Sequence, residues 1–261
     1  METDKNKVIF EISGNIAYVT LNNPDRHNAF DDGIIADLTG IFNDIAVNPD
    51  IRAMVLASNG KNFSAGADLN WMRRMAGYSY QENLRDANAL AVMLKALNFL
   101  PQLTIAKVQG AAFGGAVGLA SCCDIVLADK QARFCLSEVK LGLIPATISP
   151  YVINAIGAKA CRRYFQTAER FSAYKAMQLG LVNEVVELDL LDDTCDNLLE
   201  KMMNNGPEAV KQAKQLIFDV TGKEMDGHLL RETSERIAAI RVSEQGQEGL
   251  SAFFEQRAAN W

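Results

Sequence analysis

The chain has 261 residues, of which 49% are hydrophobic and 22% are charged, as in an ordinary globular protein with a substantial core. Its formal net charge of −6 argues against a nucleic-acid-binding protein and against binding to an anionic membrane. Five cysteines without a C-x-x-C pair and only two histidines predict no metal site. Residues 1–7 lack the apolar segment of a signal peptide, and the longest uncharged run, residues 108–123, is too short to span a bilayer, so we expect a cytoplasmic protein.

The first half of the chain alternates strands with helices. Two β-rich runs, residues 8–12 and 16–21, are separated by a short turn and predict a hairpin. A loop over residues 22–30 leads to a helix that Asp31 or Asp32 could cap. A buried strand over 53–57 follows, then a helix beginning near Asn70, a second helix over about 80–100 and a strand over 103–108. This alternation predicts an α/β fold.

The second half becomes helical towards its end. A loop over residues 142–150 precedes helices near 150–156 and 158–166, a helix from about 172 to 180 and a short strand over 181–186. We therefore divide the chain into an α/β core over 1–190 and a helical region over 191–261. The helical region has apolar stripes that one small tail could not bury alone, so we expect an oligomer whose contacts involve it. These apolar residues include Leu229, Leu230, Ile237, Ile240, Leu250, Phe253 and Phe254.

Two loops rich in glycine and alanine each follow a strand and lead into a helix. The first is Asn59–Leu69, and the second begins at Gly110 and passes Gly114-Gly115. The backbone N–H groups at a helix start favour negative charge, so the two loops could together form an oxyanion hole. The second loop lacks the Lys-Ser or Lys-Thr of a P-loop, and Gly114-Gly115-x-x-Gly118 is not G-x-G-x-x-G. Each loop could also be a glycine turn that only permits close packing.

Together these motifs resemble the crotonase, or enoyl-CoA hydratase/isomerase, superfamily over nearly the whole chain. The most specific pieces are Phe63-Ser-Ala-Gly-Ala-Asp-Leu69 and Gly110-Ala-Ala-Phe-Gly-Gly115, the latter followed by Cys123-Asp124-Ile125. The resemblance implies a crotonase-like spiral of ββα units with a C-terminal helical trimerisation region. It also implies an acyl-CoA thioester substrate, a homohexamer built as a dimer of trimers, and no separate cofactor, because CoA arrives as part of the substrate.

The resemblance also implies the roles of individual residues. The N–H groups of Ala67 and Gly115 would hold the thioester oxygen, and Glu138 would act as the acid and base. Glu138 could instead be a solvated surface residue, and Lys61, Arg26 and Arg257 could equally be surface charges. The residues implied in CoA binding are Ala65, Asp68 and Leu69 near the adenine, and Lys61, Arg26 and Arg257 at the phosphates.

One departure from the family pattern concerns Gly118. Typical hydratases of the family carry a second glutamate at this position. A single carboxylate can still take a proton from water and later deliver it to carbon, since the base becomes the acid once it is protonated. We expect Gly118 to leave room for a 3-substituent and to remove a negative charge beside an anionic substrate.

A finer resemblance concerns the substrate. The segments Ala112–Asp124 and Leu136–Pro150 resemble bacterial methylglutaconyl-CoA hydratases and the similar isohexenylglutaconyl-CoA hydratases. The resemblance therefore implies a lyase that hydrates 3-methylglutaconyl-CoA in leucine degradation. The alternatives are isohexenylglutaconyl-CoA in acyclic terpene degradation, an enoyl-CoA delta-isomerase using the same carboxylate, and a non-catalytic acyl-CoA-binding or RNA-binding member of the fold.

Overall fold

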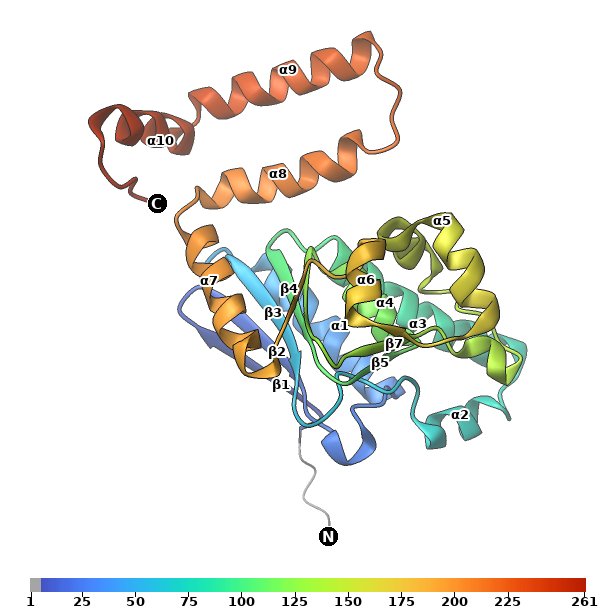
Figure 1. The fold of residues 1–261 in the computed structure, drawn as a ribbon. Helices are drawn as coiled ribbons and strands as arrows, with labels where there is room; N and C mark the ends of the chain where they lie inside the picture. The colour runs from blue at the N-terminus through green and yellow to red at the C-terminus, as the bar shows by residue number, and fades with distance from the viewer. Residues whose placement is uncertain (1–5) are drawn as a thin grey trace. The chain divides into compact units, whose positions relative to one another are not determined.

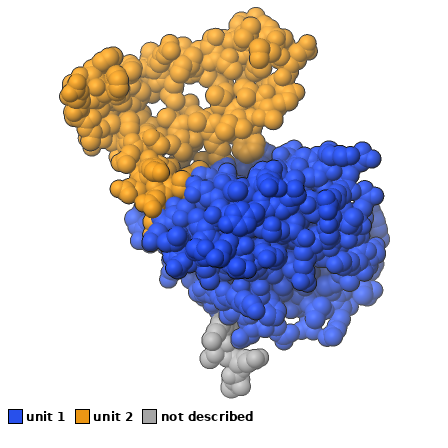
Figure 2. Space-filling model, in the orientation of Figure 1, with its two compact units in different colours: residues 1–100, 104–195 blue, residues 101–103, 196–261 orange. Residues whose placement is uncertain are grey.

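The computed structural model describes residues 6–261, so most of the N-terminal segment in which we expect no signal peptide lies outside the described residues. The chain divides into two compact units, coloured separately in Figure 2. The first unit comprises the residues up to Leu100 together with Thr104–Cys195, and the second comprises Pro101–Leu103 and Asp196–Trp261. The predicted boundary, after residue 190, lies a few residues before the end of the first unit.

The larger sheet carries most of the predicted strands, several of which lie side by side in Figure 1. Its order is β1-β2-β3-β4-β6-β9. The hairpin of β1 and β2 is antiparallel, as predicted, whereas β2 with β3, β4 with β6 and β6 with β9 are parallel. The strands are β1 Val8–Ser13, β2 Ile16–Leu21, β3 Ala53–Ser58, β4 Leu103–Val108, β6 Ile125–Asp129 and β9 Glu184–Val186.

A second, smaller sheet has the order β5-β7-β8 and was not predicted. It consists of β5 Ala111–Phe113, β7 Arg133–Cys135 and β8 Phe171–Ser172. β5 and β7 are parallel, with Phe113 opposite Cys135. Parallel strands end at the same edge of a sheet, so the residues that follow Phe113 and Cys135 emerge together. This register brings the second glycine-rich loop next to the segment that contains Glu138.

The helices of the first unit begin where the sequence supplies side-chain caps. Asp31 accepts a hydrogen bond from the Ile34 N–H at 2.9 Å and starts α1, and Ser79 with Glu82 forms a capping box that starts α3. The two helices predicted near residues 150–156 and 158–166 are both present within α5, where Gly157, with a non-helical φ of +76°, divides them. The helices are α1 Asp32–Val47, α2 Leu69–Met75, α3 Tyr80–Asn98, α4 Gly115–Cys122, α5 Ser149–Thr167 and α6 Ala173–Leu179.

The C-terminal part of the chain is helical, as predicted. Its helices are α7 Leu191–Met203, α8 Pro207–Val220, α9 Gly227–Val242 and α10 Glu244–Glu255. Within the second unit α10 contacts both α8 and α9. Several large apolar side chains of the second unit are nevertheless exposed, and Phe253 and Phe254 in α10 are each 77% exposed. Between residues 6 and 261 no helix combines the length and the apolar character that a membrane crossing requires.

Candidate active site

The two glycine-rich loops lie side by side because the first one pairs with β5. The Ser64 N–H donates to the Ala111 carbonyl at 2.9 Å, and the Phe113 N–H donates to the Ser64 carbonyl at 3.0 Å. Gly66 then adopts a φ of +101°, and a Cβ there would lie 3.3 Å from the Phe113 carbonyl oxygen. The backbone conformation therefore favours glycine at this point, and the close approach of the Phe113 carbonyl adds to that preference. The pairing brings Ala67 close to the start of α4.

The turn before α4 also depends on glycine. Gly114 has φ +56° and ψ −120°, and its N–H donates to the Cys135 carbonyl at 2.8 Å. Gly115 is the first residue of α4, where backbone N–H groups have no partner within the helix. The structure records no acceptor for the N–H of Gly115 or of Ala67 within residues 6–261. Two unused backbone donors therefore come together from separate loops.

Glu138 lies three residues after β7, next to the Gly114 turn. A Cβ on Gly114 would lie 3.2 Å from the Oε1 atom of Glu138, so the glycine lets the carboxylate approach the backbone. The Oε2 atom is buried and has no hydrogen-bond partner among the described residues. Burial raises the pKa of Glu138 above its ordinary value. A desolvated carboxyl group with an unused oxygen is suited to accepting and returning a proton.

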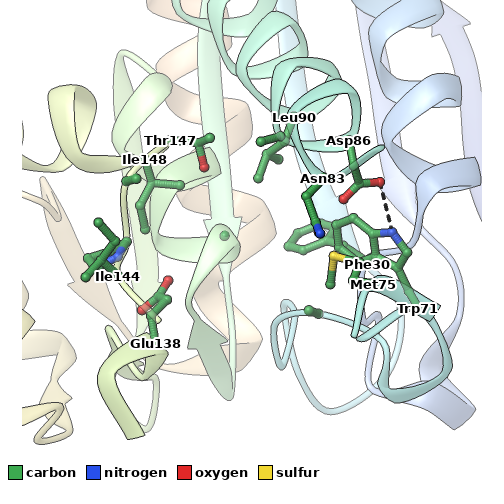
Figure 3. Close-up of a pocket in the computed structure, with 15 residues that line it drawn as sticks. Phe30, Trp71, Met75, Asn83, Asp86, Leu90, Glu138, Ile144, Thr147 and Ile148 are labelled. Carbon is green, nitrogen blue, oxygen red and sulfur yellow. Dashed lines mark hydrogen bonds between the residues drawn. The ribbon is translucent and has the colours of Figure 1, made fainter. Parts of the chain in front are cut away.

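These groups share one cavity of about 360 Å³, shown in Figure 3. Glu138 and Ile144 lie on one side, and Trp71, Met75 and Asp86 lie on the other. Most of the lining is apolar, and none of its residues is lysine, arginine or histidine. The lining residues are Phe30, Ala67, Trp71, Met75, Asn83, Asp86, Ala87, Leu90, Gly115, Glu138, Ile144, Pro145, Ala146, Thr147 and Ile148.

The structure brings together the three residues expected at the reaction centre, Ala67, Gly115 and Glu138, since all of them line this cavity. Gly118 does not line it. A Cβ on Gly118 would overlap the Cγ2 of Ile148 and lie 2.9 Å from its Cβ, while a Leu94 methyl group lies at 3.6 Å. The expectation that Gly118 leaves room for a substituent is therefore wrong, because Ile148 fills the space that a larger side chain would take.

Three of the residues expected to bind CoA lie on two neighbouring loops, outside the cavity lining. Arg26 ends a short 3₁₀ helix, Pro24–Arg26, and Lys61 and Ala65 belong to the first glycine-rich loop. The loops are joined by the Ala65 N–H, which donates to the His27 carbonyl at 3.0 Å. The buried Asn28 side chain also donates to two carbonyls of the first glycine-rich loop, at 2.9 and 2.8 Å. The backbone at Arg26, Lys61 and Ala65 is therefore held in place.

The other residues expected to bind CoA have different surroundings. Asp68 caps α2 by accepting hydrogen bonds from the Asn70 N–H at 2.8 Å and the Trp71 N–H at 3.1 Å, whereas Leu69 is 66% exposed. Arg257 belongs to the second unit, where its guanidinium donates to Glu248 at 2.6 Å and to Glu255 at 2.7 Å. A phosphate could reach that guanidinium only by competing with two carboxylates.

The cavity also includes residues that the sequence reasoning did not single out. Asn83, Asp86 and Leu90 all reach it from α3. Their spacing of three and four residues places them on one face of a helix, which is the signal that could have identified them. Asp86 accepts a hydrogen bond from the Trp71 Nε1 atom at 3.2 Å. In the described part of the chain no group of three or more His, Cys, Asp or Glu side chains could hold a metal ion.

Comparison with known proteins places this geometry in context. The family model for enoyl-CoA hydratase/isomerase matches residues 11–261. A putative enoyl-CoA hydratase of Thermus thermophilus is 34% identical over 94% of this chain and 96% of its own length. A short-chain-enoyl-CoA hydratase of Clostridium acetobutylicum is 31% identical over 97% of this chain and 96% of its own length. The crystal structure of an enoyl-CoA hydratase from Shewanella pealeana superposes with a TM-score of 0.95 at 46% identity, covering 98% of this chain and 96% of that one.

Proposed function

Because the chain belongs to the enoyl-CoA hydratase/isomerase family, whose crotonase fold it shares, we propose that its cavity hydrates 2-enoyl-CoA thioesters with Glu138 as the acid and base. The enzyme is a hydro-lyase. The N–H groups of Ala67 and Gly115 bind the thioester oxygen. The observation that carries this proposal is the meeting, in one mostly apolar cavity, of two unused backbone donors and a desolvated carboxyl group.

The proposed reaction needs only one carboxylate. Glu138 takes a proton from water as the oxygen attacks C3 of the enoyl group, and the electron pair of the double bond moves towards the thioester carbonyl. The negative charge that develops on the thioester oxygen is stabilised by the two N–H donors, and loss of one such donor elsewhere costs about 3 kcal/mol in barrier. Protonated Glu138 then delivers its proton to C2. The product gains a hydroxyl at C3 and a hydrogen at C2, and the carboxylate is restored.

The pKa of Glu138 supports both steps. The buried carboxyl group has a raised pKa, so it is a stronger base than an ordinary glutamate once it is ionised. Its free Oε2 atom can accept the hydrogen bond of the attacking water. Ile148 fills the position from which a side chain at Gly118 would act, which supports a mechanism with a single carboxylate.

The finer expectation is 3-methylglutaconyl-CoA, and the isohexenyl analogue is its alternative. Both carry a second carboxylate. The cavity lining offers neither of them a lysine, arginine or histidine. We therefore propose 2-enoyl-CoA thioesters in general as the substrate class, and we keep 3-methylglutaconyl-CoA as a test substrate, because a lining without a cation does not favour its second carboxylate. The delta-isomerase alternative would use the same Glu138 to move a proton between two carbons.

Steady-state assays can separate these functions. We would compare crotonyl-CoA, 3-methylglutaconyl-CoA and a 3-enoyl-CoA with the wild-type enzyme and with Glu138→Gln. Hydration of a 2-enoyl-CoA that is lost in the variant supports the proposal. Conversion of the 3-enoyl-CoA alone would identify an isomerase, and binding of CoA esters without turnover would identify a non-catalytic protein.

We also propose that the chain assembles into a homohexamer, a dimer of trimers, through its helical C-terminal region. The support within the second unit is the exposure of apolar side chains that water does not favour, including Phe253, Phe254 and Ile237. Light scattering coupled to gel filtration tests this assembly. A monomer at micromolar concentration would contradict it.

A further inference from the structure

The cavity wall opposite Glu138 carries a second carboxylate, that of Asp86 (Figure 3). Asp86 lies on α3, and its Oδ1 atom accepts the hydrogen bond from the Nε1 atom of Trp71, a residue that is only 5% exposed. The Oδ2 atom is directed towards the cavity in Figure 3. Trp71 therefore fixes one oxygen of the carboxylate, while the other remains available to a ligand.

The charges around this carboxylate are unbalanced. Two of the cavity-lining side chains, Asp86 and Glu138, are acidic, and no lining residue is basic. The positive charge of Arg74 lowers the pKa of Asp86, but Arg74 does not line the cavity and pairs with Asp32 at 2.5 Å. Burial raises the pKa of Asp86, the Trp71 hydrogen bond lowers it, and the charge of Asp32 raises it again. With two carboxylates and no cation in its lining, the cavity wall disfavours further negative charge.

We propose that Asp86 determines which acyl groups the cavity accepts, by rejecting an acyl chain that ends in a carboxylate and accepting one that is uncharged or ends in a hydroxyl. This inference rests on the proposed function, because an acyl chain enters the cavity only if its thioester is held beside Glu138. A like charge in a partly desolvated cavity is repelled more strongly than in water. A hydroxyl group, in contrast, can donate a hydrogen bond to the Oδ2 atom.

A purely structural role for Asp86 has different consequences. If the carboxylate only held the Trp71 ring in place, loss of its charge would affect every substrate alike. Asp86→Asn separates the two roles, because an asparagine oxygen can still accept the Trp71 hydrogen bond while the negative charge is removed. The matched control is Asp44→Asn, which makes the same change of charge on an exposed position of α1 that does not line the cavity.

The experiment compares three CoA thioesters of the same chain length. They are 2-hexenoyl-CoA, 6-hydroxy-2-hexenoyl-CoA and 2,3-dehydroadipyl-CoA, whose C6 atoms carry hydrogen, a hydroxyl and a carboxylate oxygen pair, respectively. In the wild type we expect kcat/KM for the dehydroadipyl ester to be at least tenfold below that of the other two, mainly through KM. The discrimination, defined as kcat/KM for 2-hexenoyl-CoA divided by kcat/KM for the dehydroadipyl ester, should fall at least fivefold in Asp86→Asn. Asp44→Asn should leave this discrimination unchanged. Added salt should also reduce this discrimination in the wild type, because salt screens the repulsion between Asp86 and the carboxylate of the acyl chain.

The outcomes distinguish this inference from the proposed function. If the wild type hydrates 2-hexenoyl-CoA but accepts the dehydroadipyl ester equally well, the role of Asp86 is refuted and the hydratase function stands. An equal loss of kcat/KM for all three esters in Asp86→Asn would also refute the specificity role of Asp86, in favour of the structural role. Failure of the wild type to hydrate any of the three esters would overturn the proposed function itself.

Discussion

Gly118→Ala tests whether Ile148 fills the space beside Gly118. In a helix interior, alanine is more stable than glycine by about 1 kcal/mol. Here, however, the added methyl group would lie 2.9 Å from the Cβ of Ile148 and even closer to its Cγ2, in a fully buried environment. Overpacking of this kind typically costs about 1–3 kcal/mol. We therefore expect a net loss of roughly 1 kcal/mol in the free energy of unfolding.

The matched control is Gly40→Ala in α1. Gly40 is also inside a helix, but it is exposed and no atom lies within 4 Å of its added Cβ. This substitution should stabilise the protein by about 0.5–1 kcal/mol. The two alanines therefore act in opposite directions, and the difference between them measures the contact with Ile148.

A double-mutant cycle provides the assay. Urea unfolding followed by circular dichroism, at one protein concentration, would give the midpoints of Gly118→Ala, Ile148→Ala and the double variant. Ile148→Ala alone should cost about 2–5 kcal/mol, because it leaves a void. With that void present, Gly118→Ala should become stabilising, so the two changes are strongly non-additive. If Gly118→Ala costs the same in both backgrounds, our explanation of this position is refuted.

Four further predictions concern the proposed reaction centre and the loops. Glu138→Gln should lower kcat for 2-enoyl-CoA hydration by about 10²–10⁴-fold. In the wild type, the acid limb of the plot of kcat/KM against pH should lie above the ordinary glutamate range, since burial raises the pKa of Glu138. An acid limb at about pH 4.3 would contradict the assignment of Glu138 as the base. The folded state holds the proton of Glu138 more tightly than the unfolded state does, because burial raises the pKa of Glu138. The wild type should therefore lose stability relative to Glu138→Gln as pH rises through this raised pKa, and should regain it below the ordinary glutamate pKa. Urea midpoints at several pH values measure this difference. Asn28→Ala should cost about 2–4 kcal/mol in urea unfolding, because two loop carbonyls lose their donor; a loss under 1 kcal/mol would mean that water replaces it. Gly66→Ala should lower kcat/KM and cost about 1–3 kcal/mol, because alanine does not tolerate its φ of +101°, and wild-type activity would show that the loop adapts.

The sequence predicted those parts of the fold that local chemistry controls. The hairpin of β1 and β2, the start of α1 at Asp31 or Asp32 and the helix that follows Gly114 all depend on residues close together in the chain. The structure confirms them and shows that Asp31 is the cap of α1. The small sheet was missed because β5, β7 and β8 are two or three residues long and are stabilised by pairing with distant partners. Hydrophobic periodicity cannot identify strands of that length.

The same distinction applies to the candidate site. Ala67, Gly115 and Glu138 were predicted from the sequence, and the structure brings them to one cavity. Ile148 and Asp86 were not predicted. Neither residue belongs to a glycine-rich motif, and the part that each plays depends on neighbours from another element, Gly118 and Trp71. A contact between side chains that are distant in sequence leaves no pattern in a single chain.

The proposed thioester donors are backbone atoms, and this has a consequence for how the enzyme can change. Substitution of Ala67 or Gly115 by any residue except proline keeps the N–H group, whereas the cavity wall around it is built from side chains that one codon change can alter. Charge and volume at Asp86 and Ile148 can therefore diverge while the means of stabilising the thioester oxygen is retained. Such an arrangement makes new acyl specificities accessible by gradual evolution. It also makes the cavity wall, and not the glycine-rich loops, the place to begin a mutant library for altered substrates.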